Sequence, residues 1–453
     1  MAIERRDAES DGSRVRAASR TIPRSVRDGI SSLAVNVVSA LAGLAVAVLL
    51  ARALGPEGYG SYSYVIALVT VVSVPAQLGL PNLLIRETAN ARVHQEWGLM
   101  RGLWRWSSLT AGSASFGLAV AGLLIGWIFS SDFTDRQLST FYWGLVLIPL
   151  VALGNLRGAA LSGLQHVILG QLPERILRPL IFLFLIAVFW IMFPAAALGA
   201  DVAMGLNAFA ALVAFLIGAW FLRNVRPEGL TARPVPEYRA GAWIKAVIPL
   251  AFVAGMFLLN SRADIICLGI FMSPADVGIY RVVVAGGAMV VFALNALNMI
   301  FAPRMARLHA MGEMEGLQRL ATMSARMALL LAIPVLLLFV FFGKWILARV
   351  FGAPFADGYQ ALVILGIGQL ANAGMGSVGT LLNMTGHERD TARAVGLSAA
   401  ANIVLNLVLI PILGINGAAL ATTISMALWN IVMWRAVYYR LGIRSAAIRF
   451  DRG

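Results

Sequence analysis

The sequence has little of the residues that build disulfides and metal sites. It contains one cysteine, Cys267, so an intramolecular disulfide is impossible, and the apolar residues around it indicate a buried, inert thiol. Its four histidines fall in segments expected to be loops, without the Cys, Asp or Glu spacing that metal sites use. No glycine-rich phosphate loop is present. The sequence therefore predicts no metal, no cofactor and no ATP hydrolysis.

Charged residues are scarce as well. They make up 13% of the chain, against about 25% in soluble proteins. Hydrophobic residues make up 59%, with a mean hydropathy of +0.80. A spanning helix needs about 20 mostly apolar residues, and twelve segments qualify, which predicts an all-α integral membrane protein. They are roughly 30–52, 61–84, 104–129, 139–163, 174–194, 197–222, 243–270, 279–302, 320–345, 359–383, 392–411 and 415–438.

Acidic residues are outnumbered, 22 against 36 Lys and Arg, which gives a net charge of +14. These basic residues are spread over short segments between apolar helices, so they indicate membrane orientation and not a nucleic-acid partner. With the N-terminus inside, 29 fall on the cytoplasmic side and five outside, while Arg157 and Arg262 lie within helices. This asymmetry predicts an even number of spans with both termini cytoplasmic. The outer loops are short, so no extracytoplasmic domain is expected.

The chain contains an internal repeat. Pro56, Gly60, Tyr62, Gln77 and Arg86 align without a gap with residues 218 positions later, close to half the chain length. Those residues are Pro274, Gly278, Tyr280, Asn295 and Arg304. Two copies of six spans each keep the same orientation. The repeat thus predicts two six-helix lobes related by a pseudo-two-fold axis along the membrane normal.

The composition also predicts where these parts begin and end. Residues 1–28 carry seven arginines and few large apolar side chains, and should form a disordered basic cytoplasmic tail. The N-terminal lobe should span 29–222. A proline-containing, charged cytoplasmic linker, 223–241, should separate it from the C-terminal lobe, 242–440. Residues 441–453 should form a second cytoplasmic tail.

The second span of each lobe is one candidate for lining a cavity. Gln77 and Asn295 lie about two-thirds of the way along these spans, and Arg86 and Arg304 lie at their cytoplasmic ends. Amides and guanidinium groups arranged in this way could receive an anionic head group, because guanidinium matches phosphate geometry. The alternative is that both arginines only reach the interface and orient the chain.

The seventh span holds the sharpest site hypothesis, with Asn260, Arg262 and Asp264 in one apolar helix. Ionisable residues in a span usually face a bundle interior or a cavity. Arg262 and Asp264 are about 200° apart on a helix, so each needs its own partner. Arg262 could hold a phosphate, and Asp264 could carry a coupling proton or balance the charge of Arg262. The alternative is that both are solvated near the outer interface.

Other polar residues have weaker claims. Arg157 is expected to reach the cytoplasmic interface, and Asn36 either lines the cavity or bonds between helices. The group Glu174, Arg175 and Arg178 is interpreted as structural. The outer-end arginines, Arg52 and Arg281, are ambiguous.

The run LLARALGPEGYGSYSYVIALVTVV, followed by LGLPNLLIRE, resembles the N-terminal motif of bacterial polysaccharide-export flippases. These belong to the multidrug/oligosaccharidyl-lipid/polysaccharide exporter superfamily. DIICLGIFMSPADVGIYRVV is similar to the motif around that family's seventh and eighth spans. The resemblance implies a central cavity lined by the first, second, seventh and eighth spans, with basic residues for an anionic carrier. It also implies alternating access without ATP, with an undecaprenyl-diphosphate-linked oligosaccharide as substrate.

The expected function is therefore a non-enzymatic one, the flipping of a lipid-linked oligosaccharide across a bacterial inner membrane for polysaccharide or lipopolysaccharide biosynthesis. Membrane lipids and polysaccharide-assembly proteins are the other expected partners. Two alternatives stay open. One is an ion-coupled exporter of small molecules, which should carry acidic residues deep in the N-terminal lobe. The other is a membrane glycosyl polymerase or ligase, which usually needs polar groups in a sizeable outer loop.

Overall fold

A computed structural model describes residues 24–77, 79–194, 197–232 and 234–447 of the chain. Within these residues all regular structure is helical. The expected N-terminal tail falls mostly outside the described residues, although the first helix already begins at Arg24. The helices are α2 (Arg24–Gln77), α3 (Leu80–Val93), α4 (Trp97–Ile128), α5 (Asp135–Gly163), α6 (Val167–Leu172), α7 (Arg178–Met192), α8 (Ala200–Asn224), α9 (Glu228–Thr231), α10 (Ala240–Phe271), α11 (Pro274–Ala310), α12 (Met314–Ile346), α13 (Tyr359–Met375), α14 (Val378–Met384), α15 (Glu388–Leu413) and α16 (Ile415–Leu441).

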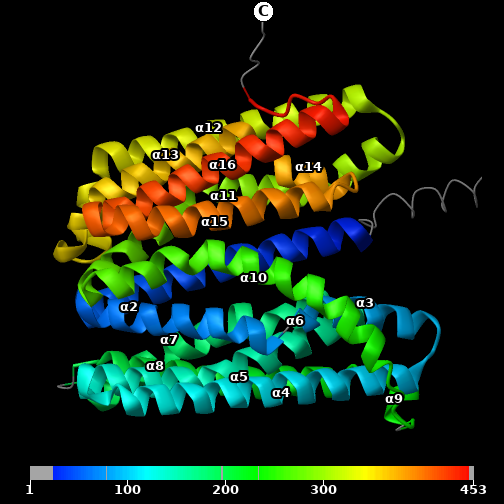
Figure 1. Cartoon of the computed structure of the whole chain (residues 1–453), viewed down its shortest axis with the longest axis horizontal. Coiled ribbons are helices and arrows are strands. Elements are labelled where there is room, and N and C mark those ends of the chain that lie inside the picture. The colour runs from blue at the N-terminus through cyan, green and yellow to red at the C-terminus, as the bar shows by residue number, and fades with distance from the viewer. Residues whose placement is uncertain (1–23, 78, 195–196, 233, 448–453) are drawn as a thin grey trace, which may run out of the picture.

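Nine helices among the described residues are long and apolar enough to cross a membrane, or ten if the bent pair 353–375 and 378–384 forms one span. An all-helical membrane protein is thus confirmed, while the number twelve stays a prediction. The count treats α2 as one span, yet α2 has 54 residues with a non-helical break at Gly55 (φ 66°). At 1.5 Å per residue it is about 80 Å long, more than twice the hydrocarbon thickness of about 30 Å. Figure 1 shows α2 doubling back at one end of the bundle.

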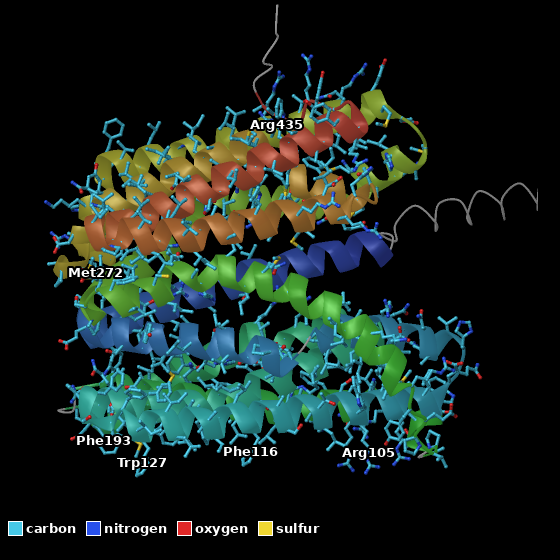
Figure 2. The ribbon with its side chains drawn as sticks, in the orientation of Figure 1. Arg105, Phe116, Trp127, Phe193, Met272 and Arg435 are labelled. Atoms are coloured by element: carbon cyan, nitrogen blue, oxygen red, sulfur yellow. The ribbon has the colours of Figure 1, made fainter. Side chains whose placement is uncertain are left out.

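The helices gather in two groups with α2 and α10 between them (Figure 1). In the N-terminal group, α5 packs between α4 and α8. In the C-terminal group, α16 packs against α13 and α15, and α11 packs against α12 and α13. The most extensive contact between elements joins α2 to α11. Apolar side chains on the outside, such as Phe116, Trp127 and Phe193, are exposed and suit a lipid environment (Figure 2).

The repeated motif explains the close contact of α2 with α11. A Cβ atom at Gly60 would overlap the Pro274 carbonyl oxygen, and one at Gly278 would overlap the Pro56 carbonyl oxygen. The contact is reciprocal, so equivalent glycines of the two repeats each make room for the backbone of the other. Nearby, the Arg52 guanidinium donates hydrogen bonds to the carbonyl oxygens of Arg349 and Val350. This end of the bundle lies opposite α3 and α9 (Figure 1).

Two segments expected to be a linker and a tail pack against helices. Glu237 donates its N–H to the carbonyl oxygen of Gly98 on α4 (3.0 Å), and a Cβ at Gly102 would overlap the Glu237 backbone. After α16, Ile443 and Ser445 are buried, and Ala447 donates its N–H to the Gly374 carbonyl oxygen (2.9 Å). Residues 442–447 are therefore part of the packed structure, and 448–453 lie outside the described residues.

The second predicted span is interrupted. α2 ends at Gln77 and α3 begins at Leu80, after Gly79 in a left-handed conformation (φ 70°). Pro81 sits in the first turn of α3, where its missing N–H is not needed. The expected span of 61–84 is thus two helices, and Arg86 lies on the second one. In the later repeat, α11 runs unbroken from Pro274 to Ala310 in spite of Pro303.

Candidate functional site

Two arginines lie together between the two helix groups. Arg262 on α10 is close enough to Arg281 on α11 for their charges to interact. Arg281 also lines a pocket of about 490 Å³, walled by apolar residues of α2 between Val37 and Ala47 and of α11 between Val284 and Phe292. Among the described residues neither arginine belongs to an ion pair. The buried Nε of Arg262 has no hydrogen-bond partner there. The buried Asp264 is near enough for its charge to interact with both arginines. The two guanidinium groups are thus balanced only in part, by one carboxyl group.

Asp264, two residues after Arg262, has partners of its own. Its Oδ2 accepts a hydrogen bond from the Tyr280 hydroxyl (2.9 Å), and its Oδ1 accepts the N–H of Ile265 (2.8 Å). The Tyr280 hydroxyl also lies 3.4 Å from Thr422 Oγ1 on α16. Asp264 is 6% exposed, so the carboxyl group is buried and does not lie at a solvated interface. It forms no ion pair with Arg262 among the described residues, in keeping with their angular separation.

Tyr62, the repeat equivalent of Tyr280, anchors a polar network in the N-terminal group. Its hydroxyl accepts a hydrogen bond from Asn207 Nδ2 (2.8 Å) on α8. Asn207 Oδ1 in turn accepts hydrogen bonds from the Arg178 guanidinium (3.2 and 3.3 Å). Glu174 forms ion pairs with Arg178 (3.5 Å) and with Arg157 (3.7 Å). Arg157 is 7% exposed and so does not reach the interface as expected. The network ties the kinked segment 173–177 to four helices, α2, α5, α7 and α8.

A further polar link leaves this network toward α2. Arg175, on the same kinked segment, donates a hydrogen bond from Nη1 to Asn36 Oδ1 (2.6 Å). Asn36 Nδ2 lies 3.3 Å from the sulfur of Met299 on α11. Asn36 therefore bonds between helices, one of the two roles expected for it, and Arg175 lies next to the junction of the two groups.

The amides predicted to line the cavity differ from each other. Gln77 Oε1 accepts a hydrogen bond from Asn155 Nδ2 on α5 (3.0 Å), and its own amide donates to the Ser73 carbonyl oxygen. Asn295 is exposed on α11. Asn260 on α10 has a buried Oδ1 without a hydrogen-bond partner among the described residues. Their role in binding stays a prediction.

The arginines predicted as a symmetric pair lie in different surroundings. Arg86 is exposed and forms an ion pair with its neighbour Glu87 (2.9 Å). Arg304 lines an open pocket of about 610 Å³ between α11 and α12, together with Arg307, Glu313 and Arg319. The break at Gly79 in one repeat and the unbroken α11 in the other account for the difference. Their proposed contact with an anionic head group is untested.

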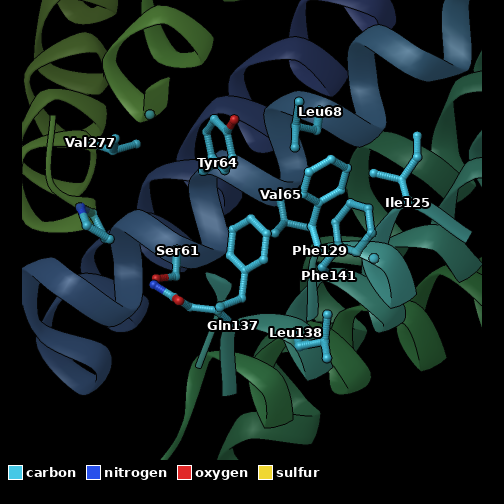
Figure 3. Close-up of a pocket in the computed structure, with 14 residues that line it drawn as sticks. Ser61, Tyr64, Val65, Leu68, Ile125, Phe129, Gln137, Leu138, Phe141 and Val277 are labelled. Carbon is cyan, nitrogen blue, oxygen red and sulfur yellow. The ribbon is translucent and has the colours of Figure 1, made fainter. Parts of the chain in front are cut away.

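An apolar pocket of about 360 Å³ opens where α2, α4 and α5 meet α10 and α11. Figure 3 shows Tyr64, Phe129 and Phe141 around it, with Ser61 beside Gln137 at one edge. Gly269 and Pro274 complete the wall from the C-terminal side. The pocket lies on the same end of the bundle as the reciprocal glycine contact, and it suits a hydrocarbon segment.

Among the described residues no group of three or more His, Cys, Asp or Glu side chains lies close enough to hold a metal ion. The sequence does not show the network around Asn207 or the hydrogen bonds of the two tyrosines. Its only signal for them is the alignment of Tyr62 with Tyr280, which indicates no partner. The role of Arg281 is ambiguous from the sequence, because the sequence does not reveal that Arg281 lies near Arg262.

The chain is similar in sequence to one protein family and to two flippases of known sequence. The sequence profile of the family described as polysaccharide biosynthesis protein matches residues 25–309. The probable flippase AglR of Haloferax volcanii is 25% identical over 89% of this chain and 81% of that protein. The probable low-salt glycan biosynthesis flippase Agl15 of the same organism is 26% identical over 51% of this chain, and the match spans about half of that relative, 49%.

Two solved structures share the fold at low sequence identity. A multidrug resistance MATE family transporter of the MOP superfamily, in an inward-facing conformation, superposes with a TM-score of 0.71 at 13% identity, over 89% of this chain and 94% of that one. The lipid II flippase MurJ, in an inward closed conformation, superposes with a TM-score of 0.68 at 12% identity, over 90% of this chain and 87% of that one. These likenesses show a common fold.

Proposed function

The chain belongs to the polysaccharide biosynthesis protein family, and from this premise we propose that it flips an undecaprenyl-diphosphate-linked oligosaccharide across a bacterial inner membrane. The cargo would move from the cytoplasmic to the outer leaflet by alternating access, for the assembly of a surface polysaccharide. The flippases among its relatives and the shared MOP fold support a non-catalytic transporter.

The observation that carries the proposal is the proximity of Arg262 and Arg281, which form no ion pair among the described residues, with Arg281 lining a pocket between the helix groups. A diphosphate brings at least two negative charges, and guanidinium groups bind phosphate oxygens with charge-assisted hydrogen bonds. Two like charges held close together are unfavourable without an anion. A bound diphosphate would therefore stabilise two positive charges that Asp264 alone balances only in part.

The apolar pocket between α2, α4, α5 and α11 is the observation that favours a substrate with a lipid part. A prenyl chain is pure hydrocarbon and gains free energy from apolar surroundings. Tyr64, Phe129 and Phe141 offer such surroundings next to the junction of the two groups. The carrier's tail would lie there or in the bilayer, while the diphosphate lies at the arginines and the glycan in the aqueous space.

Alternating access requires two lobes and a gate. We propose twelve crossings. Ten come from the count in which the bent pair 353–375 and 378–384 is one span, one more comes from counting α2 as two across Gly55, and α10 is the twelfth. The lobes would be 29–222 and 242–440, joined by the cytoplasmic linker 223–241. Both termini would lie in the cytoplasm, an orientation that the arginine distribution supports. On this orientation the reciprocal contact of Gly60 and Gly278 closes the outer side and has to open during transport.

The test is a proteoliposome assay with a fluorescent polyprenyl-diphosphate sugar. Wild-type protein should make the inner-leaflet label accessible to a quencher added outside faster than empty vesicles do. Arg262→Gln/Arg281→Gln should lower the rate at least about 100-fold, since two charge-assisted contacts of roughly 1.5–3 kcal/mol each are lost. Arg389→Gln/Arg435→Gln, which removes two exposed arginines elsewhere, is the control. Folded wild-type protein without activity, or equal loss in the control, would refute the proposal.

A second candidate, the ion-coupled export of small molecules, is favoured by one observation. Asp264 is a buried carboxyl group whose hydrogen bond with Tyr280 couples two helices. A carboxyl group in this position could bind and release a proton during the cycle. In the N-terminal group, the partly buried Glu174 is already paired with two arginines. Uptake of a cationic dye into inverted vesicles, abolished by Asp264→Asn, would favour the exporter; lipid flipping without dye transport would exclude it.

A further inference from the structure

A second cationic pocket lies on the side of the N-terminal group that faces away from the C-terminal group. It has a volume of about 470 Å³, and α5 forms its floor between α4 and α8. Four arginines line it: Arg101, Arg105, Arg157 and Arg226. Its lining contains no acidic residue. In Figure 2 Arg105 points away from the bundle at the edge farthest from the C-terminal group. The pocket is therefore separate from the site of Arg262 and Arg281.

Arg157 is built into the floor of this pocket. Gly218 on α8 has no side chain, and a Cβ atom there would collide with the Arg157 guanidinium. That guanidinium lies over the Phe215 ring, 4.7 Å from its centroid, and donates to the Phe215 carbonyl oxygen. The side chain is 7% exposed, and its Nε has no hydrogen-bond partner among the described residues. The Glu174 carboxylate, which does not line the pocket, forms ion pairs with both Arg157 and Arg178.

The rim carries charges that are available to a ligand. Arg105 and Arg226 are exposed, and neither takes part in an ion pair within the described part of the chain. Arg101 donates a hydrogen bond from Nη1 to the Pro234 carbonyl oxygen (2.7 Å), and its Nε and Nη2 groups take no part in that bond. Three guanidinium groups around an opening recognise phosphate oxygens well.

The remaining walls are apolar and continue into a lipid-facing surface. Leu153, Leu156 and Leu222 line the pocket beside Trp104. Three turns along α4 from Arg105, Phe116 is 68% exposed and projects on the same side (Figure 2). The pocket lies near the start of α4 and the end of α8, where the membrane surface is expected. A ligand that fits has a phosphate and, next to it, acyl chains.

We propose that this pocket binds the head group of an anionic phospholipid of the surrounding leaflet, with its acyl chains along the exposed apolar face of α4. The occupant is a resident lipid and not the transported cargo, because the pocket faces the bilayer and not the junction of the helix groups. Charge complementarity excludes a neutral or zwitterionic lipid as the preferred partner, since the lining has no acidic group to receive a choline or amine.

The experiment measures lipid binding to the full-length protein in detergent by native mass spectrometry, with phosphatidylglycerol, phosphatidylcholine and inorganic phosphate as probes. The wild type should bind phosphatidylglycerol about tenfold or more tighter than phosphatidylcholine. Arg105→Gln/Arg226→Gln should weaken phosphatidylglycerol binding about tenfold per guanidinium removed. Arg389→Gln/Arg435→Gln removes the same charge from exposed positions in the C-terminal group and should leave binding unchanged.

Three results would overturn the proposal. Equal affinity for the two lipids would show that charge does not select the occupant. Equal loss in the two double variants would show that binding follows net charge and not this pocket. Displacement of phosphatidylglycerol by inorganic phosphate alone would show that the apolar walls add nothing and that the ligand is a free anion. The exchanged arginines are exposed, so size-exclusion chromatography should report unchanged folding for both variants.

Discussion

Replacing Glu174, which is only partly exposed, with glutamine should destabilise the protein. Its carboxylate forms ion pairs with Arg157 and Arg178, whose side chains are 6% and 19% exposed. Without that charge, two guanidinium groups remain close together in a poorly hydrated region. Breaking a buried ion pair by removing one partner costs about 3–5 kcal/mol. Because Glu174 itself is 19% exposed and water reaches it, we expect a loss near the lower end, about 3 kcal/mol.

The assay is the apparent melting temperature in detergent, followed by loss of monodisperse protein. Domains of about 150–250 residues lose about 2–4 °C per kcal/mol, and the loss is smaller for a longer chain, so Glu174→Gln should melt about 5 °C lower. Arg157→Gln/Glu174→Gln should recover part of this loss, because the double change removes one charge of each sign. Glu315→Gln is the control, since Glu315 pairs with Arg319 on the surface at 91% exposure and should change nothing measurable. A Glu174→Gln variant as stable as the wild type would refute the interpretation of a buried network.

Three further predictions follow from the same packing. Gly60→Ala should lower the melting temperature and should slow flipping at least about tenfold, because its Cβ atom would overlap the Pro274 carbonyl oxygen. A Cβ atom at Gly112 meets open space, so Gly112→Ala should change neither quantity. Tyr280→Phe should melt lower than Tyr62→Phe: the first leaves the buried Asp264 carboxyl group without its hydroxyl partner, the second costs only about 1 kcal/mol for the bond to Asn207, and the reverse order would contradict the assignment. Truncation after residue 441 should cost about 2–3 kcal/mol relative to truncation after Ala447, as burial of Ile443 and the bond of Ala447 to Gly374 are lost; equal melting of the two products would show that residues 442–447 add no stability.

The sequence determined the class of the protein, because a chain with 13% charged residues and long apolar runs has no other stable environment than a bilayer. It also located the repeat, since Gly60 and Gly278 appear at equivalent positions. It did not reveal why those glycines are there. The reason is a reciprocal backbone contact between α2 and α11, and sequence spacing does not show which faces of two distant helices meet.

The candidate site divides in the same way. Arg262 and Asp264 stand out in the sequence, since ionisable residues are rare in apolar helices. Only the tertiary structure places Arg281 beside Arg262, turns Asp264 toward Tyr280, and joins Glu174 to Arg157. Hydropathy reports how far each residue favours lipid over water, which is a local property. The partner of a buried polar group depends on how helices cross, and that is decided by the packing of the whole bundle.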